Sequence, residues 1–237
     1  DDSSKDNTLL IVENFIKENN DINIKIFNAE KEGKKLAISQ ALHLAHNDLV
    51  IVTDADCVLK TTWIESIVNF YNEKKCKMIL APVLLAPAET FFEKIQVLEH
   101  LSLIGSTAGS ANIGFPVMCN GANMAYEREA ALEVEKLRKD FNIPSGDDMF
   151  LMEQFVKKYG SKNVKFLLSK TAIVKSIYEE VLPYLQVEKK EGMELKREWP
   201  ISENIKIQQF IGRNKKAVQQ EGVQFEFFGE GDKVIDQ

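Results

Sequence analysis

The sequence predicts an α/β domain with a mostly parallel sheet flanked by helices. Amphipathic helical stretches alternate with short apolar stretches along the first part of the chain, as in domains where helices connect parallel strands. Residues 49–52 form an unbroken run of Leu, Val and Ile, which favours a strand covered on both faces. Two acids follow that run, at the strand end where ligands bind in such sheets.

The expected elements follow one another in a regular order. Residues 8–19 predict a helix, because apolar side chains return at three- and four-residue spacing. Residues 22–28 alternate apolar and polar side chains and predict a strand. A second helix is expected over residues 34–46, and the strand from residue 49 then ends at residue 54. Residues 62–71 predict a third helix, and residues 78–83 predict a further strand.

Asp54 and Asp56 lie one residue apart at the end of the expected strand. Carboxylate oxygens in this arrangement can hold Mg²⁺ or Mn²⁺, which keeps its remaining positions for waters and substrate phosphates. Such an ion offsets the charge that develops on a departing diphosphate. Solvated acids at a strand end are also common, so the pair alone leaves both interpretations open.

Composition excludes several classes of partner and site. The chain has 36 acids against 30 bases and a net charge of −6, so no nucleic-acid partner is expected. The three cysteines are widely spaced, which indicates neither a disulfide framework nor a zinc site and favours a reducing compartment. The longest apolar run, residues 78–88, is interrupted by two prolines and is shorter than the roughly 18 residues of a spanning helix. We expect a cytoplasmic protein.

Four motifs in order resemble family 2 nucleotide-sugar glycosyltransferases. "EGKKLAISQALHLAHNDLVIVTDADCVL", residues 32–59, is similar to the family's stretch from a G-K-x-x-A helix to a D-x-D motif. "DDSSKDNT", residues 1–8, is similar to the turn after the family's second strand. "PVMCNGANMAYERE", residues 116–129, and "SGDDMFLMEQF", residues 145–155, are similar to the family's G-A-N-x-A-Y and acid-acid motifs. The resemblance covers residues 1–175 without the family's first strand, and implies a GT-A-like (Rossmann-like) domain that is N-terminally truncated.

The resemblance implies a role for each matching position. Asp54 and Asp56 would bind the metal and the donor diphosphate, with Asp56 as the direct ligand. Asp1, Asp2 and Lys34 match nucleotide-contacting positions. Asp148 matches the general base, beside a second acid, Asp147. The backbone of residues 120–123 would line a sugar or acceptor pocket, which comprises Asn120, Gly121, Ala122 and Asn123.

Simpler explanations exist for two of these motifs. Acids favour the N-terminus of a helix, so the pair Asp147 and Asp148 also suits a helix cap before "MFLMEQF"; both roles can hold, with Asp147 capping and Asp148 reacting. Asn and Gly suit a tight turn, which is the simpler explanation for residues 120–123. The apolar residues of "TFFEKIQVLEHLSLIG", residues 90–105, predict contacts with a core or a partner helix, and a membrane-interface role is the alternative.

The chain changes character after residue 175. Residues 212–237 read as a helix, an alternating strand, a glycine turn and a strand. This stretch resembles a truncated PASTA module of Gram-positive penicillin-binding proteins, a small α+β module. We therefore expect a glycosyltransferase domain over residues 1–175 and a PASTA-like or linker module over residues 176–237. Residues 177–237 are expected to behave as a separate unit that neither touches the acid sites nor completes the sheet.

Two classes of function follow. The first is an inverting, metal-dependent transfer of a sugar from a nucleotide-diphosphate donor, expected to be a UDP-sugar, to the hydroxyl of a glycan or lipid-linked acceptor in cell-envelope synthesis. Peripheral association with the inner face of the membrane belongs to this interpretation. The alternative is a non-catalytic binding module of the cell envelope that carries an inactive glycosyltransferase scaffold. The ordered motifs favour the first class, and the missing first strand favours the second.

Overall fold

The computed structural model describes residues 1, 4, 7–29, 33–55, 57–86, 88, 90–137, 146–177 and 225–226. Within these ranges the backbone alone is described for Asp147, Ile177 and residues 225–226. The described α-helices are α1 (Thr8–Glu18), α2 (Lys34–Leu44), α3 (Trp63–Lys74), α4 (Phe91–Asn112), α5 (Arg128–Glu135) and α6 (Asp147–Tyr159). The described 3-10 turns are η1 (Gly121–Asn123), η2 (Ser161–Asn163) and η3 (Lys170–Ala172).

The main sheet has four described strands in the order β2-β6-β4-β7. These are β2 (Leu49–Val52), β6 (Met124–Glu127), β4 (Met78–Leu80) and β7 (Val164–Phe166). Strands β2 and β4 both pair antiparallel with β6, and β7 pairs parallel with β4. Three strands therefore run in one direction while β6 runs in the other, and the predicted α/β class is confirmed as a mixed sheet flanked by helices.

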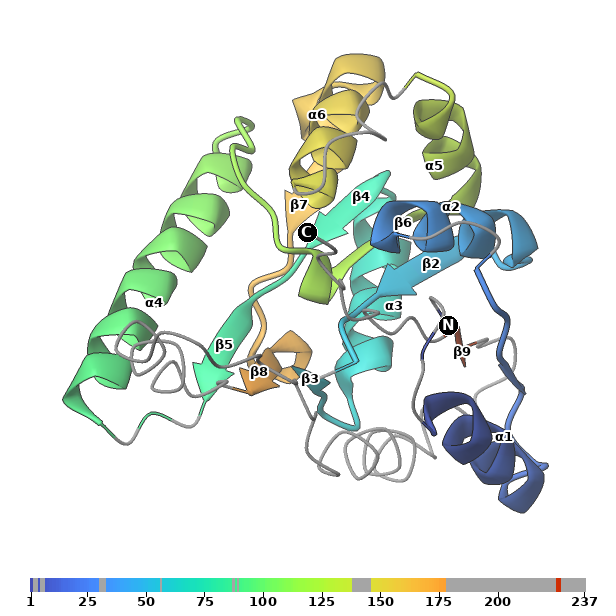
Figure 1. The fold of residues 1–237 in the computed structure, drawn as a ribbon. Coiled ribbons are helices and arrows are strands. Elements are labelled where there is room, and N and C mark those ends of the chain that lie inside the picture. Colours follow the sequence, from blue (N-terminus) through green and yellow to red (C-terminus); the bar gives the residue numbers. More distant parts are fainter. Residues whose placement is uncertain are drawn as a thin grey trace, which may run out of the picture.

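Helices cover both faces of this sheet. Successive strand residues point to opposite sides, so alternate residues belong to two different cores. Ile79 and Ala125 belong to a core that includes Trp63, Ile64 and Ile67 of α3 and Phe15 of α1. Met78, Leu80, Met124 and Tyr126 belong to a second core, with Leu42 of α2, Val134 of α5 and Phe155 of α6. Figure 1 shows α2, α5 and α6 gathered on one side of the sheet strands. Burial on both faces fixes the sheet between two helical layers.

The expected elements of the domain are present, with three differences. The strand expected over residues 22–28 is shorter, as β1 (Ile24–Lys25). The strand expected over residues 78–83 divides into β4 and β5 (Val83–Ala86), because Pro82 cannot donate a ladder hydrogen bond. Strand β2 packs on both cores as expected, but its side chains are only half-buried and its described partner, β6, is antiparallel.

A second sheet, in the order β3-β8-β5, lies beside α4 (Figure 1). Strands β3 (Cys57–Val58) and β8 (Val174–Ile177) pair antiparallel, and β5 pairs parallel with β8. Helix α4 begins with a capping box, in which the Thr90 hydroxyl accepts from the Glu93 amide at 3.2 Å and the Glu93 carboxylate accepts from the Thr90 amide at 2.8 Å. A ring nitrogen of His100 lies 3.0 Å from the carbonyl oxygen of Val83 and joins α4 to β5.

The apolar side chains of α4 are exposed, so the expected core contacts of this helix are wrong for most of them. Phe91 is 80% exposed, and Phe92, Ile95, Leu98, Leu101 and Leu103 are also exposed. Only Thr107 and Ala111 of the helix are buried. Among the described residues, no helix combines the length and the apolar character that crossing a membrane requires.

One strand of the tail pairs with the domain. β9 (Phe225–Glu226) runs parallel to β1, with residues 24 and 25 opposite residues 225 and 226. This two-stranded sheet is separate from the other two. β9 therefore does not extend the main sheet, and the expectation that residues 177–237 form a separate unit stays a prediction. The rest of the tail, with most of the PASTA-like pattern, lies outside the described residues.

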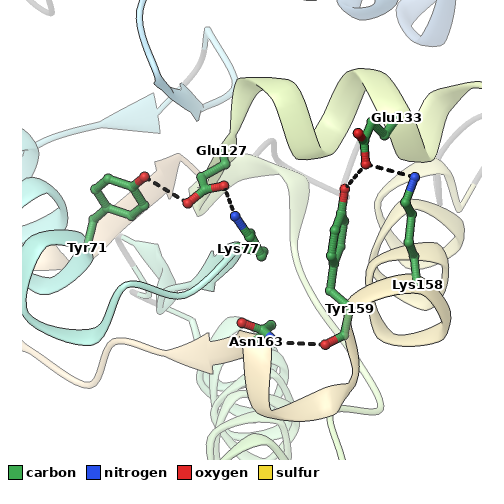
Figure 2. Close-up of polar contacts among 7 residues, drawn as sticks. All are labelled: Tyr71, Lys77, Glu127, Glu133, Lys158, Tyr159 and Asn163. Carbon is green, nitrogen blue, oxygen red and sulfur yellow. Dashed lines mark hydrogen bonds and ion pairs between the residues drawn. The ribbon is translucent and has the colours of Figure 1, made fainter.

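A polar cluster fastens the helices at the edge of the sheet where β4 begins (Figure 2). Glu127 accepts a hydrogen bond from the Tyr71 hydroxyl at 2.9 Å and pairs with the Lys77 ammonium. Burial and the Glu127 carboxylate raise the pKa of Tyr71 to about 12. Glu133 of α5 accepts from the Tyr159 hydroxyl at 2.6 Å and from Lys158 at 2.8 Å. Hydrogen bonds from Lys158 and Tyr159 lower the pKa of Glu133, so its charged form holds the C-terminus of α6 against α5.

Asn123 joins three parts of the fold at the opposite edge. Its side-chain amide donates to the carbonyls of Pro82 and Ala172, each at 2.8 Å. Its carbonyl oxygen accepts from the indole N–H of Trp63 at 3.0 Å. The residue is 1% exposed, so these partners replace water for every polar group involved.

We expect Asn123→Ala to destabilise the protein by about 3 kcal/mol or more, because it leaves buried partners of the amide unsatisfied. Urea unfolding followed by circular dichroism measures this change. Ser66→Ala is the matched control: it removes an exposed hydroxyl that bonds to Thr62 and Thr171 and should cost within about 0.5 kcal/mol. Equal losses in the two variants would contradict the structural role of Asn123.

Candidate functional site

The reversal of β6 brings the candidate residues to one edge of the sheet. Val52 and Leu80, the last residues of β2 and β4, are both paired with Met124, the first residue of β6. The turn η1 precedes Met124 and therefore lies where β2 and β4 end. Asp54 follows β2 by two residues at the same edge. Parallel strands collect ligand-binding residues at their carboxyl ends, so this edge is the candidate site.

Asp54 and Lys34 form an ion pair at this edge. The Lys34 ammonium lies 2.7 Å from Oδ1 of Asp54, and both side chains are partly exposed. Lys34 is the first residue of α2, directly after Gly33. Val50 and Val52 pack on the core that includes Leu42 of α2, so the end of β2 lies beside this helix. Two residues predicted to contact the donor are thus brought together from 20 positions apart.

Asp148 contacts the turn of residues 120–123. Its Oδ2 accepts a hydrogen bond from the Gly121 amide at 2.9 Å, and its Oδ1 accepts from the Met149 amide at 2.8 Å. Asn120 accepts from the Ala122 amide through its side chain at 2.9 Å, which shapes the turn. Asp148 therefore satisfies an amide in the first turn of α6 and also reaches the turn at residues 120–123. The N-cap position of α6 is occupied by Gly146.

The remaining candidate residues differ in what the structure describes. Asp1 is buried, and its carboxylate accepts from the Ser4 amide at 3.0 Å and from the Ser4 hydroxyl. Its backbone pairs with Phe27 and Ala29 beyond β1. Asp2, Asp56 and the side chain of Asp147 lie outside the described residues. Their predicted roles therefore stay predictions.

The described residues at this edge offer one carboxylate, that of Asp54, to a divalent cation. Among the described residues, no three acidic, histidine or cysteine side chains form a metal cage. Mg²⁺ commonly uses one or two carboxylates and completes its shell with phosphate oxygens and waters, which the partly exposed Asp54 carboxylate allows. The buried Thr53 hydroxyl, beside Asp54 in the chain, has no hydrogen-bond partner among the described residues. Asp54 is thus the described residue that would hold the ion.

Sequence reasoning missed two residues that build the site, Trp63 and Lys35. Trp63 received no role, yet its indole N–H donates to Asn123, the pocket candidate whose buried side chain holds the turn. Lys35, the neighbour of Lys34, is 9% exposed, and its ammonium lies 5.5 Å from the ring centroid of Phe150. A lysine on the core-facing side of an amphipathic helix was the available signal, because lysine is rarely buried without a partner.

A family model matches the sequence over more than half of the chain. Glycosyl transferase family 2 matches residues 1–134, which include Lys34, Asp54 and the turn η1. The chain belongs to glycosyl transferase family 2. Asp148 lies beyond the matched residues, and the family match is shorter than the motif resemblance over residues 1–175.

Solved structures share the fold of this family 2 chain at low identity. S. aureus TarS in complex with UDP is 16% identical, with a TM-score of 0.51, and the match covers 91% of this chain and 61% of that one. TarS in complex with UDP-GlcNAc is also 16% identical, with a TM-score of 0.50, and the match covers 94% of this chain and 64% of that one. Glucosyl-3-phosphoglycerate synthase from Mycobacterium tuberculosis, in complex with Mn²⁺ and UDP-glucose, is 13% identical, with a TM-score of 0.46 and coverage of 78% and 61%. The match thus spans about three fifths of these chains. None of the curated proteins matches.

Gly121 is expected to tolerate alanine. A Cβ atom there would lie 3.7 Å from Cβ and 3.8 Å from Oδ2 of Asp148, which are ordinary van der Waals distances, and its φ is not positive. We expect Gly121→Ala to change the free energy of unfolding by less than about 1 kcal/mol, as measured by urea unfolding. Gly160→Ala, at φ 81°, is the control that should cost more. A larger loss at Gly121 would show that the turn requires glycine.

Proposed function

We propose that the protein transfers a sugar from a nucleoside diphosphate donor to a hydroxyl acceptor with inversion at the sugar carbon. The observation that carries this proposal is the meeting of two pairs at one sheet edge: Lys34 with Asp54, and Asp148 with Gly121. The first pair offers charges to a diphosphate. The second offers a carboxylate base beside a backbone turn. Membership of glycosyl transferase family 2 supports the same reaction.

The donor would bind at the Lys34–Asp54 pair. Asp54, with Asp56, would hold Mg²⁺ or Mn²⁺, and the ion would supply positive charge to the departing diphosphate. Lys34 supplies a second positive charge from the first turn of α2 and can exchange its contact with Asp54 for a phosphate oxygen. A UDP-sugar is the donor to test first, since TarS, which shares the fold, was solved with UDP and with UDP-GlcNAc.

Asp148 would accept the proton of the acceptor hydroxyl. The Gly121 and Met149 amides both donate to this carboxylate. The acceptor oxygen forms the new bond to the sugar carbon as the bond from that carbon to the diphosphate oxygen breaks, and the hydroxyl proton moves to Asp148. The two backbone hydrogen bonds hold the carboxylate in one orientation, which is the geometric requirement for a general base.

An amphiphilic, lipid-linked acceptor at the inner face of the membrane fits the exposed apolar surface. Ile113 is 81% and Phe115 71% exposed on the segment that leads from α4 to the turn at residues 120–123. Together with the exposed face of α4, these residues extend an apolar surface toward the base. Exposed apolar patches of this kind mark interaction sites, and a role in cell-envelope synthesis at the cytoplasmic side follows as part of the proposal.

We expect Asp148→Asn to reduce sugar transfer by about 10²–10⁴-fold, because an amide cannot accept the proton. Donor affinity should be unchanged, whereas Asp54→Ala should weaken the binding of UDP with Mn²⁺. Calorimetric titration measures binding, and the release of UDP with an acceptor measures transfer. Transfer at the wild-type rate in Asp148→Asn would reduce Asp148 to a helix cap. Wild-type protein that binds no nucleotide would favour the alternative of a non-catalytic envelope module.

We expect the combined change of Phe91, Leu98 and Phe115 to serine to abolish binding to vesicles of equal parts phosphatidylethanolamine and phosphatidylglycerol. These side chains are exposed, so each change should cost within about 0.5 kcal/mol of stability. Co-sedimentation with the vesicles measures binding. Leu168→Ser removes an exposed leucine, 78% accessible, from the β7–η3 loop and should leave binding intact. Wild-type protein that does not sediment with vesicles would contradict the membrane proposal.

A further inference from the structure

Two neighbouring lysines of α2 contact different parts of the candidate site. Lys34 pairs with Asp54 beyond β2, while Lys35 is buried and places its ammonium over the ring of Phe150 in the first turn of α6. Consecutive residues of a helix point in directions about 100° apart. The first turn of α2 therefore contacts the donor side through one residue and the helix of Asp148 through the next.

We propose that Lys35 is a positioning residue, which fixes the first turn of α6, and with it the Asp148 carboxylate, relative to the Lys34–Asp54 pair. This inference rests on the proposed function, because it concerns the distance between the donor-binding acid and the base. Phe150 is two residues after Asp148 on α6. A shift of the Phe150 ring therefore moves the backbone that carries Asp148.

The Phe150 ring also packs against the start of its own helix. A Cβ on Gly146 would lie 3.6 Å from the Phe150 ring, so the ring packs against the residue at which α6 begins. Gly146 has φ 76°, a conformation that glycine adopts without strain. The ring thus contacts the start of its own helix and the ammonium of Lys35.

Helices α2 and α6 are also joined through the core and through α5. Leu42 of α2 lies in the same core as Phe155 of α6, and α2 packs on α5, which packs on α6. The polar cluster of Figure 2 holds α5 to α6 through Glu133 and Tyr159, near the C-terminal end of α6. That cluster fixes the far end of the helix, whereas the Lys35–Phe150 contact acts at the end that carries Asp148. A cation over an aromatic ring is a favourable contact that strengthens when it is shielded from water.

The test compares Lys35→Ala with Lys35→Arg in the full chain. Arginine retains a cation that stacks on aromatic rings, so it should keep transfer near the wild-type rate. Alanine should lower kcat by about 10–100-fold, the scale expected for a misplaced catalytic group, while the calorimetric affinity for UDP with Mn²⁺ stays within about twofold of wild type. Phe150→Leu should have a similar effect, and Lys35→Ala combined with Phe150→Leu should be no worse than either change alone, because both remove one contact.

Hydrogen exchange provides a readout that does not depend on activity. The backbone amides of Met149 and Phe150 should exchange faster in Lys35→Ala than in Lys35→Arg or wild type, since local opening governs exchange. An unchanged exchange rate together with an unchanged kcat would overturn the proposal. Loss of nucleotide affinity with unchanged exchange would also overturn it and place Lys35 in the donor site. If the wild type transfers no sugar, the proposed function fails, and the exchange rates alone decide whether Lys35 holds α6.

Discussion

The candidate site depends on the reversed direction of β6 between β2 and β4. Both neighbours run antiparallel to β6, so the turn that precedes β6 comes to the edge where they end. A parallel strand in this position would have brought its C-terminal residue there, and residues 120–123 would lie at the opposite edge. The buried amide of Asn123 holds this arrangement, since it bonds to the chain after β4, to η3 and to α3.

Charges at this edge have different kinds of partner, and the difference suits their proposed roles. Asp54 faces an ammonium on a long side chain, which can move when a phosphate arrives. Asp148 faces two backbone amides, which are fixed by η1 and by the first turn of α6. A donor-binding carboxylate needs an exchangeable partner, whereas a base needs a constant orientation. Lys35 lies between the two helices concerned. It belongs to α2, which carries Lys34, and its ammonium lies over Phe150 of α6, which carries Met149.

The two ends of α6 are held by different interactions. At the C-terminal end, Glu133 bonds to Tyr159 and Lys158, and Asn163 donates to the Tyr159 carbonyl at 2.6 Å (Figure 2). At the N-terminal end, Asp148 accepts from the Gly121 amide, the Cys119 thiol lies 3.9 Å from the Met149 sulfur, and the Lys35 ammonium lies over the Phe150 ring. The helix is therefore held at both ends, by polar side chains at the edge away from the site and by contacts with η1, Cys119 and α2 at the site. By contrast, α4 stands beside β5 with its apolar side chains exposed, so its position does not depend on a second helical layer.

The sequence alone determined what depends on nearby residues. Helical spacing identified α1, α2 and α3, and the apolar run at residues 49–52 identified β2. The motifs also predicted Lys34, Asp54 and the turn at residues 120–123 as parts of one site, and their roles there stay predictions. Tertiary structure decided which residues meet. The Asp148–Gly121 contact spans 27 positions, and the direction of β6, the pairing of β9 with β1 and the exposure of α4 all depend on distant partners. The local sequence shows whether a side chain is apolar or charged. Which element covers that side chain depends on packing between segments that are far apart in the chain. For this reason the buried Lys35 and Asn123 could be placed only from the folded structure.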